Sequence, residues 1–358
     1  MKLFLVGGFL GSGKTTAIHQ AAITFLNSGI RVAVMTNDQG EDLVDTAFIK
    51  NAGIATKEVL NGCFCCNYDQ LTKGIYSLRE TENTEIIFAE SVGSCTDLVA
   101  TIAKPLAKYN PEITVVISVF ADAGLLNALM VGSALFLNDN VRYIYKKQLE
   151  EADILIINKI DLLNDAELKK VKEQIEIEYA GKILLYQNSL EENGILKWVL
   201  ALECFQLNNE RISLDLNYDQ YAKGEAILTW VDQRMTIETE DGTAGAIALK
   251  LIHKIYSNLK KRNYPIAHLK FLLDDEVKQR KLSFTALDNN SEEFLLTDNI
   301  VNNISILLNA RIQVEFPKLE QLISEIIEQT GLETGSKIVV HKRAAFQPGY
   351  PRPTHRII

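Results

Sequence analysis

"GFLGSGKT", residues 8–15, decides the fold, because it matches the pattern G-x-x-x-x-G-K-[ST] between an apolar run and a helical pattern. Glycines in such a loop let backbone N–H groups turn inward around phosphate oxygens, and Lys14 reaches the β- and γ-phosphates. Thr15 adds a hydroxyl for Mg²⁺. A plain glycine-rich turn is disfavoured, because strand, loop and helix occur in the order that phosphate binding requires. The residues expected to bind nucleotide here are Gly8, Gly11, Ser12, Gly13, Lys14, Thr15 and Thr16, and Lys14 is also expected to be catalytic.

Short apolar runs alternate with segments of helical period on both sides of this loop. They lie at 3–8, 31–37, 85–91, 113–120, 153–159 and 182–188. Strands that alternate with helices imply right-handed crossovers and a mostly parallel sheet covered on both faces. The expected fold class is α/β, a P-loop NTPase domain with a mostly parallel sheet, followed by a smaller α+β domain.

The alternation stops in a polar, Asn- and Asp-rich stretch at 206–225. We therefore expect a GTPase-type domain over 1–206, a linker over 207–224 and an α+β domain with antiparallel pairing over 225–335. The last part, 336–358, is expected to be a Pro-rich basic tail. A solvated or docked extended tail is favoured there over an anion-binding device.

The composition narrows the functional classes. Apolar residues make up 47% and charged residues 23% of the 358 residues, and the formal net charge is −9. This balance argues against nucleic-acid binding through bulk electrostatics. We find no export signal and no apolar run long enough for a membrane span, so a cytoplasmic protein with no membrane partner is expected. Of the five cysteines, Cys204 is expected to be buried in a helix.

The second nucleotide motif is NKID, residues 158–161, at the carboxyl end of a predicted strand. The Asp161 carboxylate would accept two hydrogen bonds from the guanine edge, whereas adenine would leave it unpaired. Asn158 would join loops around the base, and the stem of Lys159 would lie along the purine face. The motif favours GTP over ATP, and NSL (188–190) is a further candidate for contact with the base.

Two more loops follow predicted strands, TNDQGEDLVD (36–45) and AESVG (89–93). Such loops contact the γ-phosphate and magnesium in GTPases. Glu90 is expected to orient the attacking water or to contact Mg²⁺, and it is the second expected catalytic residue. The expected magnesium residues are Thr15, Asp38, Glu41 and Glu90.

The stretch NGCFCC, residues 61–66, contains three of the five cysteines. In an extended segment Cys63 and Cys65 point to the same side, and a turn would bring Cys66 inward, so three thiolates could share Zn²⁺ or Co²⁺. A redox pair and simply packed cysteines are the alternatives. Because the cluster lies between the two loops at 36–45 and 89–93, metal and nucleotide binding are expected to be linked.

The motifs GGFLGSGKTT, TNDQGEDLVD, NGCFCC, AESVG and NKID, in this order, resemble the CobW-type GTPases, relatives of the urease and hydrogenase accessory GTPases. The resemblance covers roughly residues 1–205. It implies GTP with Mg²⁺ in the phosphate loop, zinc or cobalt at Cys63, Cys65 and Cys66, and Asn158 and Asp161 as guanine contacts. This chain has NDQGE where the family usually has an NEFGE-like loop, and it lacks a histidine-rich stretch.

The function expected from the resemblance is a GTP-hydrolysing metallochaperone that delivers zinc or cobalt to a client metalloenzyme or cobalamin-related protein, or activates it. The alternative is a GTP-dependent conformational switch or chaperone for a cobalamin enzyme, in which zinc is purely structural. A second copy of the chain, as a homodimer, is also counted among the expected partners.

Overall fold

The computed structural model describes residues 1–37, 43–60, 62–132, 138–207, 210–285 and 300–358. The chain divides into two compact units. Unit 1 comprises Met1–Gln39, Ile49–Gly224 and Tyr350–Ile358, and unit 2 comprises Gly40–Phe48 and Glu225–Gly349. Each unit therefore takes in a segment that is distant in sequence from its main body.

Unit 1 is built on a seven-stranded sheet in which every pair is parallel, with the order β3-β2-β4-β1-β5-β6-β7. The strands are β1 (Lys2–Gly8), β2 (Val32–Asn37), β3 (Ala55–Val59), β4 (Ile86–Glu90), β5 (Thr114–Asp122), β6 (Ile154–Asn158) and β7 (Ile183–Gln187). All residues of β4 and β6 are buried, as expected of parallel strands covered on both faces. The predicted α/β class is confirmed.

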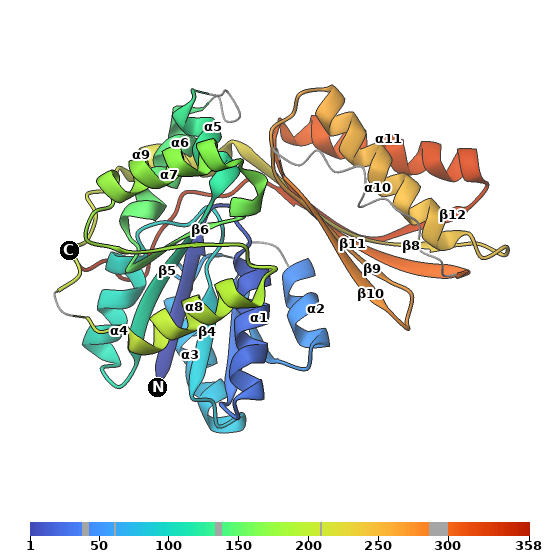
Figure 1. Cartoon of the computed structure of the whole chain (residues 1–358). Helices are drawn as coiled ribbons and strands as arrows, with labels where there is room; N and C mark the ends of the chain where they lie inside the picture. Colours follow the sequence, from blue (N-terminus) through green and yellow to red (C-terminus); the bar gives the residue numbers. More distant parts are fainter. Residues whose placement is uncertain (38–42, 61, 133–137, 208–209, 286–299) are drawn as a thin grey trace. The chain divides into compact units, whose positions relative to one another are not determined.

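Helices cover both faces of this sheet, with α1 and α8 packed together on one side and α5, α6 and α7 on the other (Figure 1). The helices up to residue 226 are α1 (Lys14–Asn27), α2 (Val44–Asn51), α3 (Tyr68–Thr81), α4 (Lys104–Tyr109), α5 (Ala123–Met130), α6 (Asp139–Glu150), α7 (Asp165–Glu178), α8 (Glu192–Cys204) and α9 (Tyr218–Ala226). Residues of α2 and α9 are divided between the two units. A π-helix, Val99–Ala103, and a 3₁₀ helix, Ile160–Leu162, complete the set. Because all strands are parallel, every loop at their carboxyl ends lies at one edge of the sheet.

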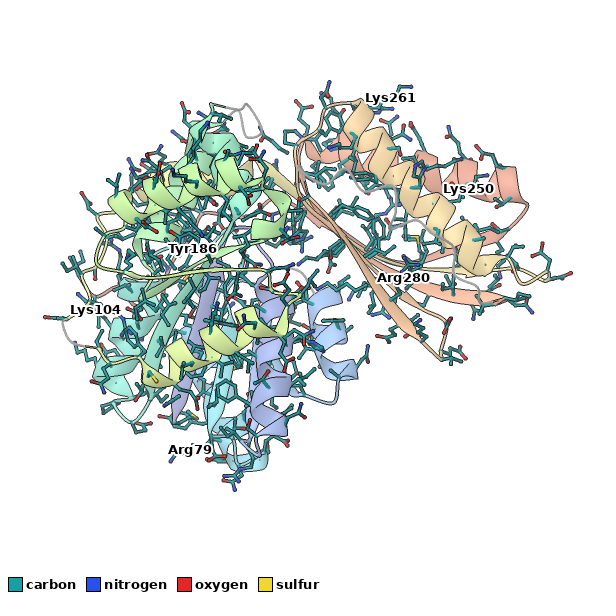
Figure 2. The ribbon with its side chains drawn as sticks, in the orientation of Figure 1. Arg79, Lys104, Tyr186, Lys250, Lys261 and Arg280 are labelled. Atoms are coloured by element: carbon teal, nitrogen blue, oxygen red, sulfur yellow. The ribbon has the colours of Figure 1, made fainter. Side chains whose placement is uncertain are left out.

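Unit 2 is a five-stranded antiparallel sheet with the order β10-β9-β11-β8-β12. Its elements are β8 (Leu228–Glu238), α10 (Ala244–Lys261), β9 (Ile266–Asp274), β10 (Gln279–Phe284), β11 (Asn303–Gln313), α11 (Phe316–Thr334) and β12 (Lys337–Phe346). Both helices pack on one face of the sheet (Figure 1). Lys250 and Lys261 project outward from α10, as Figure 2 shows, while its apolar residues enter the core.

Three expectations about particular segments need correction. The range expected to be a linker contains most of α9, which is held by the buried Tyr221 against Ile144. The range expected to be a Pro-rich basic tail, 336–358, begins with β12, which pairs with β8 at the edge of the unit 2 sheet. Cys204 is exposed rather than buried, because it lies beyond the buried face of α8 that ends at Leu202.

Among the described residues, no helix combines the length and the apolar composition needed to cross a bilayer.

Candidate functional site

The loop between β1 and α1 has a backbone that suits glycine. Gly8, Gly11 and Gly13 have φ angles of 123°, 77° and 92°. A Cβ atom on Gly8 would lie 2.2 Å from the carbonyl oxygen of Phe120, and one on Gly13 would lie 2.3 Å from the Asn158 side-chain nitrogen. Any side chain at these two positions would therefore push the loop away from β5 and β6.

Donor groups converge on this loop. The Lys14 ammonium donates hydrogen bonds to the carbonyl oxygens of Gly8 at 2.7 Å and Phe9 at 3.1 Å. The buried hydroxyl oxygen of Ser12 has no hydrogen-bond partner among the described residues, and Thr16 follows in the first turn of α1. A cation, an unsatisfied hydroxyl and the positive end of a helix together fit a phosphate group.

The end of β4 meets the start of α1. The Thr15 hydroxyl donates a hydrogen bond of 2.9 Å to the Glu90 carboxylate, and both side chains are buried. Hydroxyl and carboxylate oxygens are ligands that suit Mg²⁺. These two residues, predicted separately from sequence, therefore lie together beside the phosphate loop and fit a magnesium ion.

Asn158 joins three loops at the carboxyl edge of the sheet. Its amide nitrogen donates to the carbonyl oxygen of Ser12 at 2.8 Å, and its amide oxygen accepts from the backbone nitrogen of Ser189 at 3.0 Å and from the Ser189 hydroxyl at 2.8 Å. The structure thus brings the NKID motif, the phosphate loop and the 188–190 stretch into contact.

After Asn158, the NKID motif continues through a residue with an uncommon backbone conformation. Lys159 has a φ of 60°, in the left-handed region, and its ammonium lies 2.9 Å from the Asp122 carboxylate at the end of β5. Asp161 follows in the short 3₁₀ helix and is exposed. Its carboxylate is accessible to a base edge, as guanine recognition requires.

Asn37, the last residue of β2, binds the loop that carries the cysteines. Its amide nitrogen donates to the carbonyl oxygens of Val59 at 2.9 Å and Gly62 at 2.7 Å, and its amide oxygen accepts from the backbone nitrogen of Phe64 at 2.8 Å. Asn37 belongs to the 36–45 stretch, but no role was predicted for it from the sequence. The sequence signal that could have indicated a role for Asn37 is its position as a polar residue at the end of a buried strand.

The acidic residues of the 36–45 stretch divide into two groups. Asp38 and Glu41 lie outside the described residues. Asp45 belongs to unit 2, where its carboxylate lies 2.6 Å from the Lys270 ammonium and 2.8 Å from that of Lys281. Burial alone would raise the pKa of Asp45, but the two lysine charges hold this pKa well below its usual range.

The three cysteines of the 61–66 stretch are gathered by a turn. The backbone nitrogens of Cys66 and Asn67 both donate to the carbonyl oxygen of Cys63, at 3.0 and 2.9 Å. All three sulfur atoms lie within 4.8 Å of one another. The Cys63 and Cys66 sulfurs are 3.2 Å apart, and those of Cys65 and Cys66 are 3.8 Å apart. This grouping offers three sulfur ligands to one ion.

The thiols of this cluster differ in acidity. Hydrogen bonds from the thiols of Cys65 and Cys66 hold the pKa of Cys63 well below its usual range. The same hydrogen bonds raise the pKa of Cys65 well above its usual range and that of Cys66 to about 11. The cluster therefore favours one shared thiolate, and a divalent metal would have to displace the remaining protons.

The C-terminal tail, Tyr350–Ile358, docks in unit 1 on the backbone of this cluster. The Thr354 backbone nitrogen donates to the carbonyl oxygen of Cys65 at 2.8 Å, and its hydroxyl donates to that of Cys66 at 3.0 Å. The His355 ring packs edge-on against Tyr68 with 4.8 Å between ring centroids. The tail thus holds the main chain of two cysteines, a contact that was not predicted from the sequence.

Next to the tail, the segment after β4 binds a buried acid that lies at the end of α6. Glu151 accepts hydrogen bonds from the Thr96 hydroxyl at 3.0 Å and the Val99 backbone nitrogen at 3.1 Å. Burial, with a smaller contribution from the charge of Asp97, raises the pKa of Glu151 to about 8. No pattern in the sequence pointed to this residue.

The wild-type protein is expected to lose stability as the pH rises, because Glu151 loses its proton more readily in the unfolded chain. The Glu151→Gln variant is expected not to show this loss. The folded chain keeps this proton up to about pH 8, whereas the unfolded chain releases it near the ordinary value of 4.5. Between these values deprotonation favours the unfolded chain, so wild-type stability should fall as pH rises and level off above pH 8. Since one pKa unit corresponds to about 1.4 kcal/mol, the full effect is a few kcal/mol.

Melting temperatures of the metal-free protein across this pH range provide the measurement. Exposed Glu80 on α3, changed to glutamine, is the matched control and should keep the wild-type slope. Parallel curves for wild type and the Glu151→Gln variant would contradict the prediction.

Comparison with known proteins finds a family that matches the part of the chain containing the phosphate loop and the cysteines. Residues 2–182 match the family described as CobW/HypB/UreG, nucleotide-binding domain. The zinc chaperone CobW of Sinorhizobium sp is 26% identical over 199 residues, covering 48% of this chain and 54% of that protein. The zinc chaperone YeiR of Escherichia coli is 31% identical over 162 residues, covering 44% and 46%. The chain thus spans about half the length of the curated relatives that it matches.

Among solved structures, HypB from Helicobacter pylori in complex with nickel aligns with 60% of this chain and 91% of its own, at 16% identity and a TM-score of 0.42. The family match covers about half of the chain and includes the phosphate loop, the three cysteines and Asn158. The chain therefore belongs to the CobW/HypB/UreG family through its nucleotide-binding domain.

Proposed function

We propose that this protein is a GTP-hydrolysing metallochaperone of the cytoplasm. In this proposal it binds zinc or cobalt at Cys63, Cys65 and Cys66 and delivers the metal to a client metalloenzyme or cobalamin-related protein, or activates that client. The family membership, the names of the zinc chaperones among its relatives and the three clustered sulfurs support it. The metal ion is the cargo of the protein and not its resident cofactor.

Each nucleotide residue has a physical task in this proposal. Lys14, the Ser12 hydroxyl and the loop N–H groups hold the phosphates, and Asp161 reads the guanine edge. Thr15 and Glu90 hold Mg²⁺, which when bound would neutralise charge on the phosphates. In this proposal Glu90 would also orient the attacking water molecule.

The observation that carries the proposal is the hydrogen bonding of Asn37. One side chain at the end of β2 binds the backbone on both sides of Cys63, at Gly62 and Phe64. The loop that follows Asn37 is one of the two loops expected to sense the γ-phosphate. A change at that loop would therefore move the cysteines, and reciprocity requires that bound metal change nucleotide affinity by the same factor.

The test is competition for zinc between the full-length protein and a coloured chelator, with GTP and Mg²⁺ or with GDP. The zinc affinity of the wild type is expected to differ between the two nucleotides by about 5- to 150-fold, the usual range of allosteric coupling. The Asn37→Ala variant should still bind both ligands but lose most of this difference, because the link between β2 and the cysteine loop is gone. Exposed Asn27 at the end of α1, changed to alanine, serves as the control.

Equal zinc affinity in both nucleotide states of the wild type would contradict delivery. In that case zinc is structural, and the protein is a GTP-dependent conformational switch or chaperone.

A further inference from the structure

The C-terminal tail is anchored in unit 1 by a buried acid. Arg356 Nε donates a hydrogen bond of 2.7 Å to the Asp97 carboxylate, whose side chain is 1% exposed. The Tyr218 hydroxyl donates to the same carboxylate oxygen, also at 2.7 Å. A second guanidinium nitrogen of Arg356 donates to the carbonyl oxygen of Leu214 at 3.0 Å. Because loss of the guanidinium would leave a buried charge without its counter-ion, this pair fixes the tail more firmly than a surface ion pair would.

Backbone hydrogen bonds fix the tail on both sides of this ion pair. The Ile357 nitrogen donates to the carbonyl oxygen of Ala100 at 2.9 Å, and the Ile357 carbonyl oxygen accepts the Ser213 hydroxyl at 2.7 Å. On the other side, Thr354 donates to two carbonyl oxygens of the 61–66 stretch, as described above. Ala100 follows β4, whereas the cysteines follow β3. The tail therefore connects two loops that are separate in sequence.

The two carbonyl groups that the tail holds belong to the pair of cysteines whose spacing already suits a metal ion. Zn–S bonds of about 2.3 Å at tetrahedral angles require sulfur atoms roughly 3.8 Å apart. The Cys65 and Cys66 sulfurs are separated by 3.8 Å. Thr354 donates through its backbone nitrogen to the first of these residues and through its hydroxyl to the second. It thus restrains the main chain from which both sulfurs project.

The segment that anchors the tail begins at the nucleotide site. Glu90, at the end of β4, accepts the Thr15 hydroxyl beside the phosphate loop. Every residue from Glu90 to Asp97 is buried, and the Gln148 amide of α6 binds the backbone within this segment. Because closely packed interiors transmit displacement rather than absorb it, a shift at Glu90 would reach Arg356 through Asp97.

We propose that the C-terminal tail is a strap that retains the metal at the cysteine cluster. While Arg356 is paired with Asp97, Thr354 holds the main chain of the cysteine loop, and transfer of the metal to a client requires the tail to leave. Thr354 and Arg356 are positioning residues, because they act on the metal ligands through the backbone. The inference rests on the proposed function, because it assumes that the 61–66 cysteines bind metal.

The experiment measures how fast zinc leaves the full-length protein, loaded with Zn²⁺ in the presence of GTP and Mg²⁺, after a coloured chelator is added in excess. Arg356→Gln removes the charge that pairs with Asp97. Zinc should leave this variant about 10- to 100-fold faster, the range by which partners outside the ligand set change metal binding. Arg352→Gln makes the same change at an exposed side chain of the same tail, and it should release zinc at the wild-type rate.

A chain that ends at Gly349 lacks the whole tail and tests the strap without changing a charge in place. Zinc should leave it at least as fast as it leaves the Arg356→Gln variant. A synthetic peptide of residues 350–358, added in large excess, should slow the release again, which a damaged fold would not allow.

Equal release rates in the Arg356→Gln and Arg352→Gln variants would overturn the inference while leaving the three-cysteine site intact. Fast release from the shortened chain that the peptide leaves unchanged would overturn it as well. A wild-type protein that binds no zinc would instead overturn the proposed function.

Discussion

Replacing Lys14 with alanine is expected to lower the rate of GTP hydrolysis by about 100- to 1,000-fold, the usual cost of removing one donor that stabilises transition-state charge. The Lys14 ammonium is buried and donates to the carbonyl oxygens of Gly8 and Phe9, so it is already positioned within the phosphate loop. The loop sequence, residues 8–15, contains no other lysine or arginine. Single-turnover hydrolysis at saturating GTP and Mg²⁺ is the measurement.

The matched control is Lys73→Ala, which removes an exposed lysine from α3 in the same unit. This variant should hydrolyse GTP at the wild-type rate. A Lys14→Ala protein that remains folded and keeps its hydrolysis within a fewfold of wild type would show that the phosphate loop is not the catalytic site.

The second large effect is expected for zinc. Changing Cys63 to serine should lower zinc affinity by about 100-fold or more, above the 10- to 100-fold cost of losing an outer-shell partner. Cys63 is the thiol with the lowered pKa and hydrogen-bonds with the neighbouring thiols, so it is the ligand most ready to bind as a thiolate. A serine hydroxyl keeps its proton at neutral pH and cannot replace it.

Zinc affinity would be measured by chelator competition at two pH values. It should rise with pH in the wild type, because the Cys66 thiol, with its pKa of about 11, must lose a proton to bind metal. Cys204→Ser should behave as the wild type does. If the Cys63→Ser variant bound zinc as tightly as the wild type, the cysteine cluster would not be the zinc site.

Much of the fold follows from local patterns. The phosphate loop can be predicted because its strand, glycine turn and helix are contiguous in sequence, and the buried parallel strands can be predicted from their apolar runs. Two strands escaped this reasoning, β3 (Ala55–Val59) and β12 (Lys337–Phe346). Each lies at the edge of its sheet and mixes polar with apolar residues, so neither forms an apolar run.

The sequence by itself determined the parallel α/β domain and its family, because short-range spacing and apolar periodicity specify both. Only the tertiary structure decided which distant groups meet at the loops. Thr354 binds the backbone of Cys66 across 288 residues of sequence, and Lys281 pairs with Asp45 across 236. Hydrogen bonds and ion pairs between such distant segments leave no period and no compositional trace, so folding has to bring the partners together before they can be recognised.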